Sequence, residues 1–173
     1  MSVTDTNPNA LRWFAARTHV GQEISVRDRL EKLGVEYFIP TEQRKNYRGK
    51  LKEHPLITAL VFVHATKQRA CELKTLDHLP VNFLFDYVSH KMMTIPDKQM
   101  EDFQRVLDVS ISEGGLLGQA IQAGDRVKVI RGPLKGIEGR ILNLKGDFYV
   151  VVSLLGTVFA KAQVPRAYLE MEG

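Results

Sequence analysis

The sequence predicts an α+β protein in two parts, an antiparallel sheet with packed helices followed by a small all-β barrel. Helical and strand patterns alternate as far as Val109, and short β segments punctuated by glycine begin at Ala123. The stretch between them, residues 110–122, carries Glu113 as its only charge and is typical of a flexible linker. We therefore expect a mobile tail at residues 1–11, a sheet domain at 12–109, the linker at 110–122 and the barrel at 123–173.

Three helices are predicted from apolar residues at helical spacing. In the first, across residues 22–33, Val26, Leu30 and Leu33 share one face, and Gly34 follows as the expected C-cap. The second covers about residues 67–76. The third begins at residues 94–97 with proline in its first turn, and it places three apolar residues on one face: Met100, Phe103 and Leu107.

Strands are predicted where β-branched and aromatic residues cluster between turn residues. In the first part they cover residues 12–17, 35–40, 59–63 and 82–88, with a charged hairpin across 45–52 that turns at Gly49. In the second part they cover residues 125–130, 148–155 and 157–162. About 50 residues of short strands are too few for a two-sheet sandwich, so a closed barrel is expected.

The composition excludes several classes of protein. With 44% hydrophobic and 25% charged residues, the 173-residue chain resembles an ordinary globular protein, and its net charge of +4 is a mild basic excess. Cys71 is the only cysteine, which excludes an internal disulfide and a cysteine-based zinc site. No apolar run approaches the roughly 20 residues of a membrane span, and the polar N-terminus lacks a signal-peptide core. We expect a cytoplasmic monomer.

The sequence contains no catalytic constellation. The five histidines are scattered without metal-ligand spacing, and the glycine clusters lack the lysine and hydroxyl residue of a phosphate-binding loop. We therefore expect no enzymatic activity, no metal and no cofactor, and function is expected to lie in binding surfaces.

Two glycine-rich segments of the second part carry a resemblance to a known motif. The segments 124–129, Gly-Asp-Arg-Val-Lys-Val, and 132–141, Gly-Pro-Leu-Lys-Gly-Ile-Glu-Gly-Arg-Ile, closely resemble the KOW motif of NusG-type proteins and of several ribosomal proteins. The resemblance implies an SH3-like barrel. Gly132 and Pro133 suit the tight corner between strands, and we expect Gly139 to adopt a φ that other residues resist.

The first part resembles the N-terminal (NGN) domain of the NusG family, which is ferredoxin-like. The resemblance is carried by Trp13 and Phe14, by the helix that holds Glu23, and by the segment 55–63, Pro-Leu-Ile-Thr-Ala-Leu-Val-Phe-Val. The family usually has Phe-Pro-Gly-Tyr where this chain has Ile57–Leu60. The combination implies a transcription elongation or antitermination factor, and the departure suggests a specialised paralogue of the RfaH or Bacteroides UpxY kind.

The resemblance also implies binding sites. Family members grip the clamp helices of the largest RNA polymerase subunit with a patch that maps here to Trp13, Ile57, Leu60 and Phe62. A neighbouring face touches the non-template DNA strand in RfaH-like members, and it maps to Arg17, Thr18, His19, Gln22, Lys74 and His78. In the barrel, an apolar loop binds NusE of the ribosome or the terminator Rho, and it maps to Ile137, Leu154, Leu155 and Thr157.

Simpler interpretations stand beside these assignments. Trp13 and Phe62 also suit a hydrophobic core, and the cations also suit a solvated surface. Leu154 and Leu155 cannot both point into the barrel, since successive strand residues face opposite sides. The alternative function is an RNA-binding KOW protein of ribosome assembly or translation, which would use the barrel cations Arg126, Lys128, Arg131, Lys135, Arg140 and Lys145.

Overall fold

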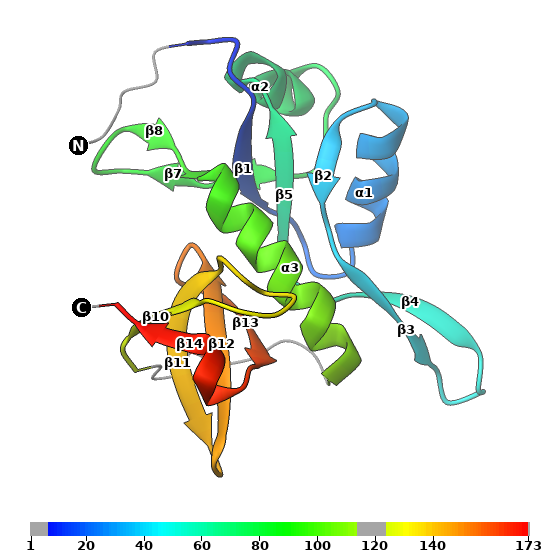
Figure 1. The fold of residues 1–173 in the computed structure, drawn as a ribbon. Coiled ribbons are helices and arrows are strands. Elements are labelled where there is room, and N and C mark those ends of the chain that lie inside the picture. The colour runs from blue at the N-terminus through cyan, green and yellow to red at the C-terminus, as the bar shows by residue number, and fades with distance from the viewer. Residues whose placement is uncertain (1–6, 114–123, 173) are drawn as a thin grey trace. The chain divides into compact units, whose positions relative to one another are not determined.

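The computed structural model describes residues 7–113 and 124–172, without the side chains of 110–113. The chain divides into unit 1, Met1–Pro96, and unit 2, Asp97–Gly173 (Figure 1). The division follows Pro96, whereas the sequence prediction assigned the helix after Pro96 to the first domain. That helix continues to Glu113, so it includes the first residues of the predicted linker. The remaining linker residues, 114–122, lie outside the described part of the chain, as does most of the predicted tail.

Unit 1 is built on an antiparallel sheet with the strand order β2-β5-β1-β6, and β9 also pairs with β1. Its strands are β1 (Arg12–Arg17), β2 (Glu36–Phe38), β5 (Leu60–Ala65), β6 (Asn82–Phe83) and β9 (Thr94–Ile95). The central pair has Phe14 opposite Val63 and Arg17 opposite Leu60. The first two predicted helices are confirmed as α1 (Glu23–Lys32) and α2 (Lys67–Thr75).

One face of this sheet carries the core of unit 1. Val61 and Val63 lie on the same face of β5, and they cluster with Leu30 of α1 and Leu73 of α2. All four side chains are fully buried. Phe62, between Val61 and Val63, faces the other side of the sheet and is also fully buried. Burial of each contributes about 1.5–3 kcal/mol, so the apolar face of both helices is held to the sheet.

Two hairpins extend the fold of unit 1. The charged hairpin is confirmed as β3 (Thr41–Lys45) and β4 (Leu51–Pro55), and the second consists of β7 (Phe85–Asp86) and β8 (Lys91–Met92). The predicted single strand over 82–88 is therefore wrong in part, because it breaks at Leu84 between β6 and β7. The Leu84 amide donates to the Ala15 carbonyl at 2.9 Å, while its carbonyl accepts from the Met93 amide at 2.9 Å. Strands of two residues leave too short a pattern to be found in sequence.

Unit 2 combines one helix with a five-stranded antiparallel sheet in the order β13-β12-β11-β10-β14. The elements are α3 (Asp97–Glu113), β10 (Arg126–Val129), β11 (Glu138–Leu144), β12 (Asp147–Leu154), β13 (Val158–Gln163), the 3-10 turn η1 (Arg166–Tyr168) and β14 (Leu169–Met171). The helix packs against β12 and β13, and Gln99 Nε2 donates to the Ser153 carbonyl at 2.7 Å. Sequence analysis did not predict β11 and β14. The β-rich character of this part is confirmed, and barrel closure stays a prediction.

The two turn glycines singled out in the sequence behave differently. Gly132 has φ of +84°, as a tight corner requires. The expectation for Gly139 was wrong, because its φ is not positive. A Cβ on Gly139 would lie 2.5 Å from the Val151 carbonyl oxygen, so close strand packing is the reason for glycine there. Within the described residues, no helix is both long and apolar enough to cross a membrane.

Candidate functional site

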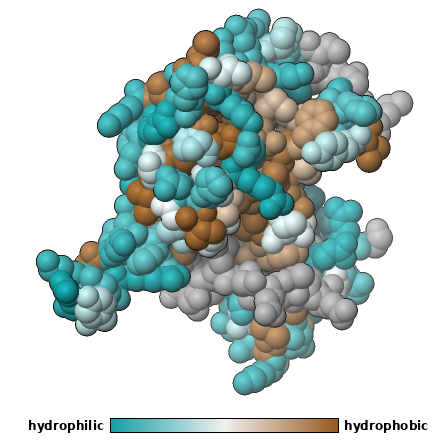
Figure 2. Space-filling model, turned by 180° about the vertical axis from the view of Figure 1, so that it is seen from behind, coloured by the Kyte–Doolittle hydropathy of each residue, from teal (hydrophilic) through white to brown (hydrophobic). Residues whose placement is uncertain are grey.

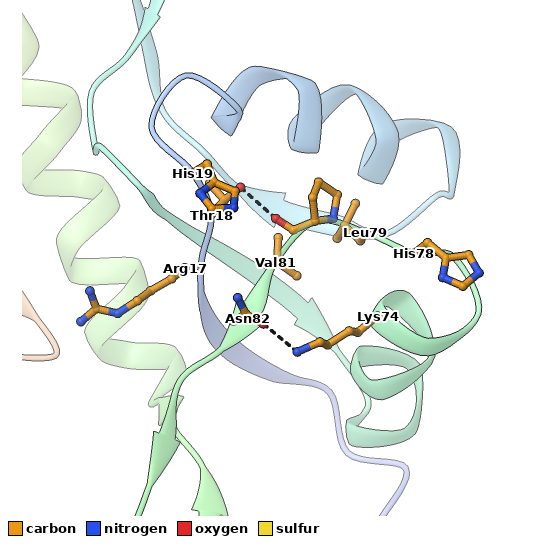
Figure 3. A pocket seen from close by; sticks show the side chains of 9 residues that line it. Arg17, Thr18, His19, Lys74, His78, Leu79, Val81 and Asn82 are labelled. Atoms are coloured by element: carbon orange, nitrogen blue, oxygen red, sulfur yellow. Dashed lines mark hydrogen bonds between the residues drawn. The ribbon is translucent and has the colours of Figure 1, made fainter.

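A pocket of about 540 Å³ in unit 1 contains five of the six residues predicted to contact DNA (Figure 3). Its lining consists of Arg17, Thr18, His19, Lys74, His78, Leu79, Pro80, Val81 and Asn82. These residues come from the end of β1, from α2 and from the segment that leads into β6. The lining holds two cations, two histidines and no carboxylate, so it favours an anionic ligand.

Two hydrogen bonds join the parts of the chain that meet at this pocket. Thr18 Oγ1 donates to the Pro80 carbonyl at 2.9 Å, which ties the end of β1 to the segment before β6. Lys74 Nζ donates to Asn82 Oδ1 at 2.7 Å. Because the acceptor is a neutral amide, Lys74 keeps an uncompensated positive charge at the pocket.

Side chains outside the predicted set position His78. Arg29 of α1 donates to the carbonyls of Asp77 and His78 at 2.5 and 3.2 Å, and Arg69 of α2 pairs with the Asp77 carboxylate at 2.7 Å. His78 itself has φ of +52°. The sequence offered no signal for the Arg29 contacts, since the partners lie 48 and 49 residues away along the chain.

The pocket residues do not converge on one point. Figure 3 shows that the Arg17 side chain extends away from Lys74 and His78. The sixth predicted residue, Gln22, is not part of the lining. It is the N-cap residue of α1, without a capping hydrogen bond from its side chain, and its amide donates to the His19 carbonyl at 3.0 Å. Such a spread of exposed cations suits an extended phosphate chain better than a single compact anion.

The predicted polymerase-binding residues differ in accessibility. Trp13, Ile57 and Phe62 are 7%, 6% and 0% exposed, whereas Leu60 is half-buried. The Trp13 ring stacks on His64 with 4.7 Å between centroids. Leu60 lies directly opposite Arg17 across the β1–β5 pair, so its side chain adjoins one cation of the pocket.

The residues predicted to bind a second partner lie in unit 2, and they also differ in accessibility. Ile137 and Leu154 are fully buried. Leu155, with φ of +56°, is half-buried in the turn after β12, and Thr157 is exposed there. Leu155 and Thr157 are thus the members of this set that a partner reaches in this conformation.

Among residues 7–109 and 124–172, no three histidine, cysteine or carboxylate side chains lie close enough together to hold a metal ion. Cys71 is exposed on α2. The pocket lining therefore remains the strongest candidate site, and its chemistry is that of a cationic binding surface.

Comparison with known proteins gives this site a family context. A family model described as transcription termination factor NusG matches residues 11–104, more than half of the 173 residues. The chain belongs to the NusG family. This is a family of transcription factors rather than enzymes. No curated protein sequence matches the chain.

One of the solved structures that the chain resembles supports the NusG assignment at the level of fold. A Thermotoga maritima NusG structure concerned with domain interaction is 18% identical, with 94% of this chain and 97% of that chain covered, at a TM-score of 0.52. The MjSpt4:Spt5 complex in its conformations A and B is 19% identical over 92% of this chain, covering 97% and 95% of those chains. The TM-scores of these two matches are 0.31 and 0.30.

Proposed function

We propose that this chain is a transcription elongation or antitermination factor that binds RNA polymerase through unit 1 and a second partner through unit 2. The observation that carries the proposal is the NusG family match over residues 11–104, which includes almost all of unit 1. The cationic pocket lies in the same unit and supports contact with the non-template DNA strand. Phosphate contact needs only accessible cations, and Arg17 and Lys74 provide them.

The polymerase contact is assigned to the surface around Leu60. Of the four residues in the predicted set, Leu60 has the most accessible side chain, and it lies beside Arg17. Contact with the clamp helices of the largest polymerase subunit would cover this leucine. Ile57 and Leu60 stand where the family usually has Phe and Tyr, which supports a specialised paralogue of the RfaH or UpxY kind.

A pull-down of purified RNA polymerase with the full-length protein tests this assignment. Leu60→Glu is expected to abolish capture, because a charge in a desolvated apolar contact costs several kcal/mol. Leu76→Glu is the matched control, since Leu76 is 69% exposed and follows α2 on the core-bearing side of the sheet. Normal capture by a folded Leu60→Glu protein contradicts the assignment, and equal loss in both variants shows an effect of charge alone.

The second partner is assigned to the turn after β12 in unit 2. Leu155 and Thr157 have exposed atoms there, and a partly exposed leucine at a turn favours a protein contact. NusE of the ribosome and Rho are the two partners that the family resemblance suggests. A competition experiment in which NusE and Rho bind to the full-length protein tests which partner is preferred. Repeating it with the Leu155→Glu variant shows whether that partner binds at this turn.

A second candidate function is RNA binding in ribosome assembly or translation. It is favoured by one observation, the placement of Arg126 of β10 directly opposite Arg140 of β11. Like charges at opposed positions repel, and an RNA phosphate would relieve that repulsion. This function would be favoured if the protein co-purified with ribosomal subunits rather than with polymerase, and if the Arg126→Gln variant no longer co-purified with them.

A further inference from the structure

The β7–β8 hairpin of unit 1 has an exposed apolar tip. Tyr87 and Val88 are 82% and 91% exposed, and Phe85, at the start of the hairpin, is 40% exposed. Figure 1 shows the hairpin extending from the sheet of unit 1, and Figure 2 shows hydrophobic surface on the same hairpin, at the right of the view. No function assigned above uses these side chains.

The tip is an ordered loop. Asp86 Oδ1 accepts from the Val88 amide at 2.9 Å, and Asp86 Oδ2 accepts from the Ser89 hydroxyl at 2.9 Å. The rings of Phe85 and Tyr87 meet edge to face, with 5.5 Å between their centroids and 66° between their planes. The exposed side chains therefore project from a defined backbone, which lowers the entropy cost of binding.

The charges of the hairpin favour an anionic partner. Asp86 is its only carboxylate, and both of its oxygens accept hydrogen bonds from the loop itself. His90 and Lys91 are exposed beside Tyr87 and Val88, so residues 87–91 present an aromatic ring and a cation without a carboxylate. This combination is typical of surfaces that stack unpaired nucleobases and hold the phosphates next to them.

The hairpin continues directly from the cationic pocket. Asn82 lines that pocket and accepts from Lys74 Nζ, and it precedes Tyr87 by five residues. The bond from the Leu84 amide to the Ala15 carbonyl holds the segment between them along β1. An extended chain of this length spans at most about 18 Å. A DNA strand with a phosphate at Lys74 therefore reaches the tip within a few nucleotides.

A second copy of the chain fits this tip less well. A stable protein interface buries roughly 800 Å² on each partner, and it is built from some 20 residues or more on each side. The tip offers three exposed apolar side chains. A single planar base is an occupant of the size that one exposed tyrosine ring covers.

We propose that the β7–β8 tip is a stacking platform for an unpaired base of the single-stranded DNA whose phosphates the pocket holds. The inference rests on the single-strand contact of the proposed function and adds a base contact to it. Tyr87 stacks on the base, Val88 packs at the edge of the base, and Lys91 neutralises a neighbouring phosphate. Every base has a face that can stack, so the tip adds affinity without sequence preference.

The test is titration of a single-stranded oligodeoxynucleotide, with its adenines replaced by 2-aminopurine, by the full-length protein. The fluorescence of 2-aminopurine falls when it stacks, so the wild-type protein is expected to quench it. Tyr87→Ala is expected to remove the quenching and to weaken binding at least about fivefold. Its salt dependence should not change, because no cation is removed.

Two further variants separate stacking from other effects. Tyr87→Phe keeps the ring and should quench and bind like the wild type. Tyr47→Ala is the matched control, since it removes a tyrosine that is 89% exposed elsewhere in unit 1, and it should retain both quenching and affinity.

Other results overturn the proposal. Normal quenching and affinity in Tyr87→Ala mean that the tip contacts no base, and weaker binding by Lys74→Gln in the same assay would leave the pocket contact standing. Equal loss in Tyr87→Ala and Tyr47→Ala means adsorption to any exposed ring. Loss of polymerase capture by Tyr87→Ala, with intact oligonucleotide binding, identifies a protein contact instead.

Failure of the proposed function gives a different pattern. If the wild-type protein does not bind the oligonucleotide, both the pocket contact and the stacking platform are wrong. Polymerase binding is tested separately, because Leu60→Glu should lose polymerase while it still quenches 2-aminopurine.

Discussion

Arg27 of α1 holds the carboxylate of Glu53 on β4 with both terminal nitrogens of its guanidinium group. Arg27 Nη1 donates to Glu53 Oε1, and Arg27 Nη2 donates to Oε2 at 3.1 Å. Thr41 Oγ1, on β3, donates to the same carboxylate at 2.6 Å. The base of the β3–β4 hairpin is therefore fixed to α1, which gives the charged tip a defined direction within unit 1.

Replacement of Arg27 by Gln is expected to loosen this hairpin while the sheet core stays intact. The bidentate ion pair would be removed, while Leu30 and Val26 on the same helix would keep their buried positions. Hydrogen exchange at the β3 and β4 amides should become faster, and exchange at β1 and β5 should not change. Lys32→Gln, at an exposed position on α1, is the control. Unchanged exchange at β3 and β4 in Arg27→Gln would show that the hairpin is stable without the ion pair to α1.

The same ion pair predicts a loss of stability in acid. The hydrogen bond from Arg27, with a second from Thr41, lowers the pKa of Glu53 below its ordinary value of 4.5. Because the pKa of Glu53 is lower in the folded state than in the unfolded state, the ion pair stabilises the fold at pH values above the unfolded-state pKa. This stabilisation is lost as the pH falls through the folded-state pKa. The difference in unfolding free energy between wild type and Glu53→Gln should therefore shrink below about pH 4.5. A difference that is constant with pH in this range would exclude the ion pair as its source.

Close packing at Gly139 predicts that alanine at this position destabilises the fold, although the φ of Gly139 is one that alanine can adopt. Gly139→Ala places a Cβ 2.5 Å from the Val151 carbonyl oxygen and should destabilise unit 2 by about 1–3 kcal/mol. In Gly124→Ala the nearest atom is the Ile141 side-chain Cγ2 at 3.2 Å, a longer contact with a side chain rather than with the backbone, so we expect a cost of less than about 1 kcal/mol. Thermal unfolding of both variants measures the difference, and equal costs would contradict the role of the carbonyl contact.

The pocket predicts a contribution of Lys74 to single-stranded DNA binding. Lys74→Gln is expected to weaken binding of an unstructured oligonucleotide and to lower the salt slope by about 0.7, the value for one phosphate contact on a single strand. Lys67→Gln, on the same helix but outside the pocket, is expected to bind normally. If both variants bind equally well, the pocket cations do not contact the strand.

The strand composition of β12 predicts that this segment stays β-sheet in the full-length protein. Val150, Val151 and Val152 are consecutive β-branched residues, which lose rotamer freedom in a helix. Backbone chemical shifts of residues 150–154 are expected to be of the β type under native conditions. Helical shifts there would show a fold-switching C-terminal part of the RfaH kind.

Local patterns were sufficient to predict most of the helices and strands. The spacing of Val26 and Leu30 predicted α1 and its buried face, and the apolar run over residues 59–63 predicted β5. The resemblance grouped Arg17, Lys74 and His78, and the structure places all three in one pocket. The short strands β6 to β9 were not resolved as separate elements, because two residues do not establish a period.

The sequence by itself determined the order of the main elements, the buried apolar strand β5 and the concentration of charge at residues 44–52, since each depends on neighbours within a few positions. Only the tertiary structure decided that Arg27 pairs with Glu53, that Arg29 holds the carbonyls at His78, and that Trp13 is buried while Leu60 stays accessible. These contacts depend on which strand and helix become neighbours. That choice is made by packing of the whole sheet, and no local period encodes it.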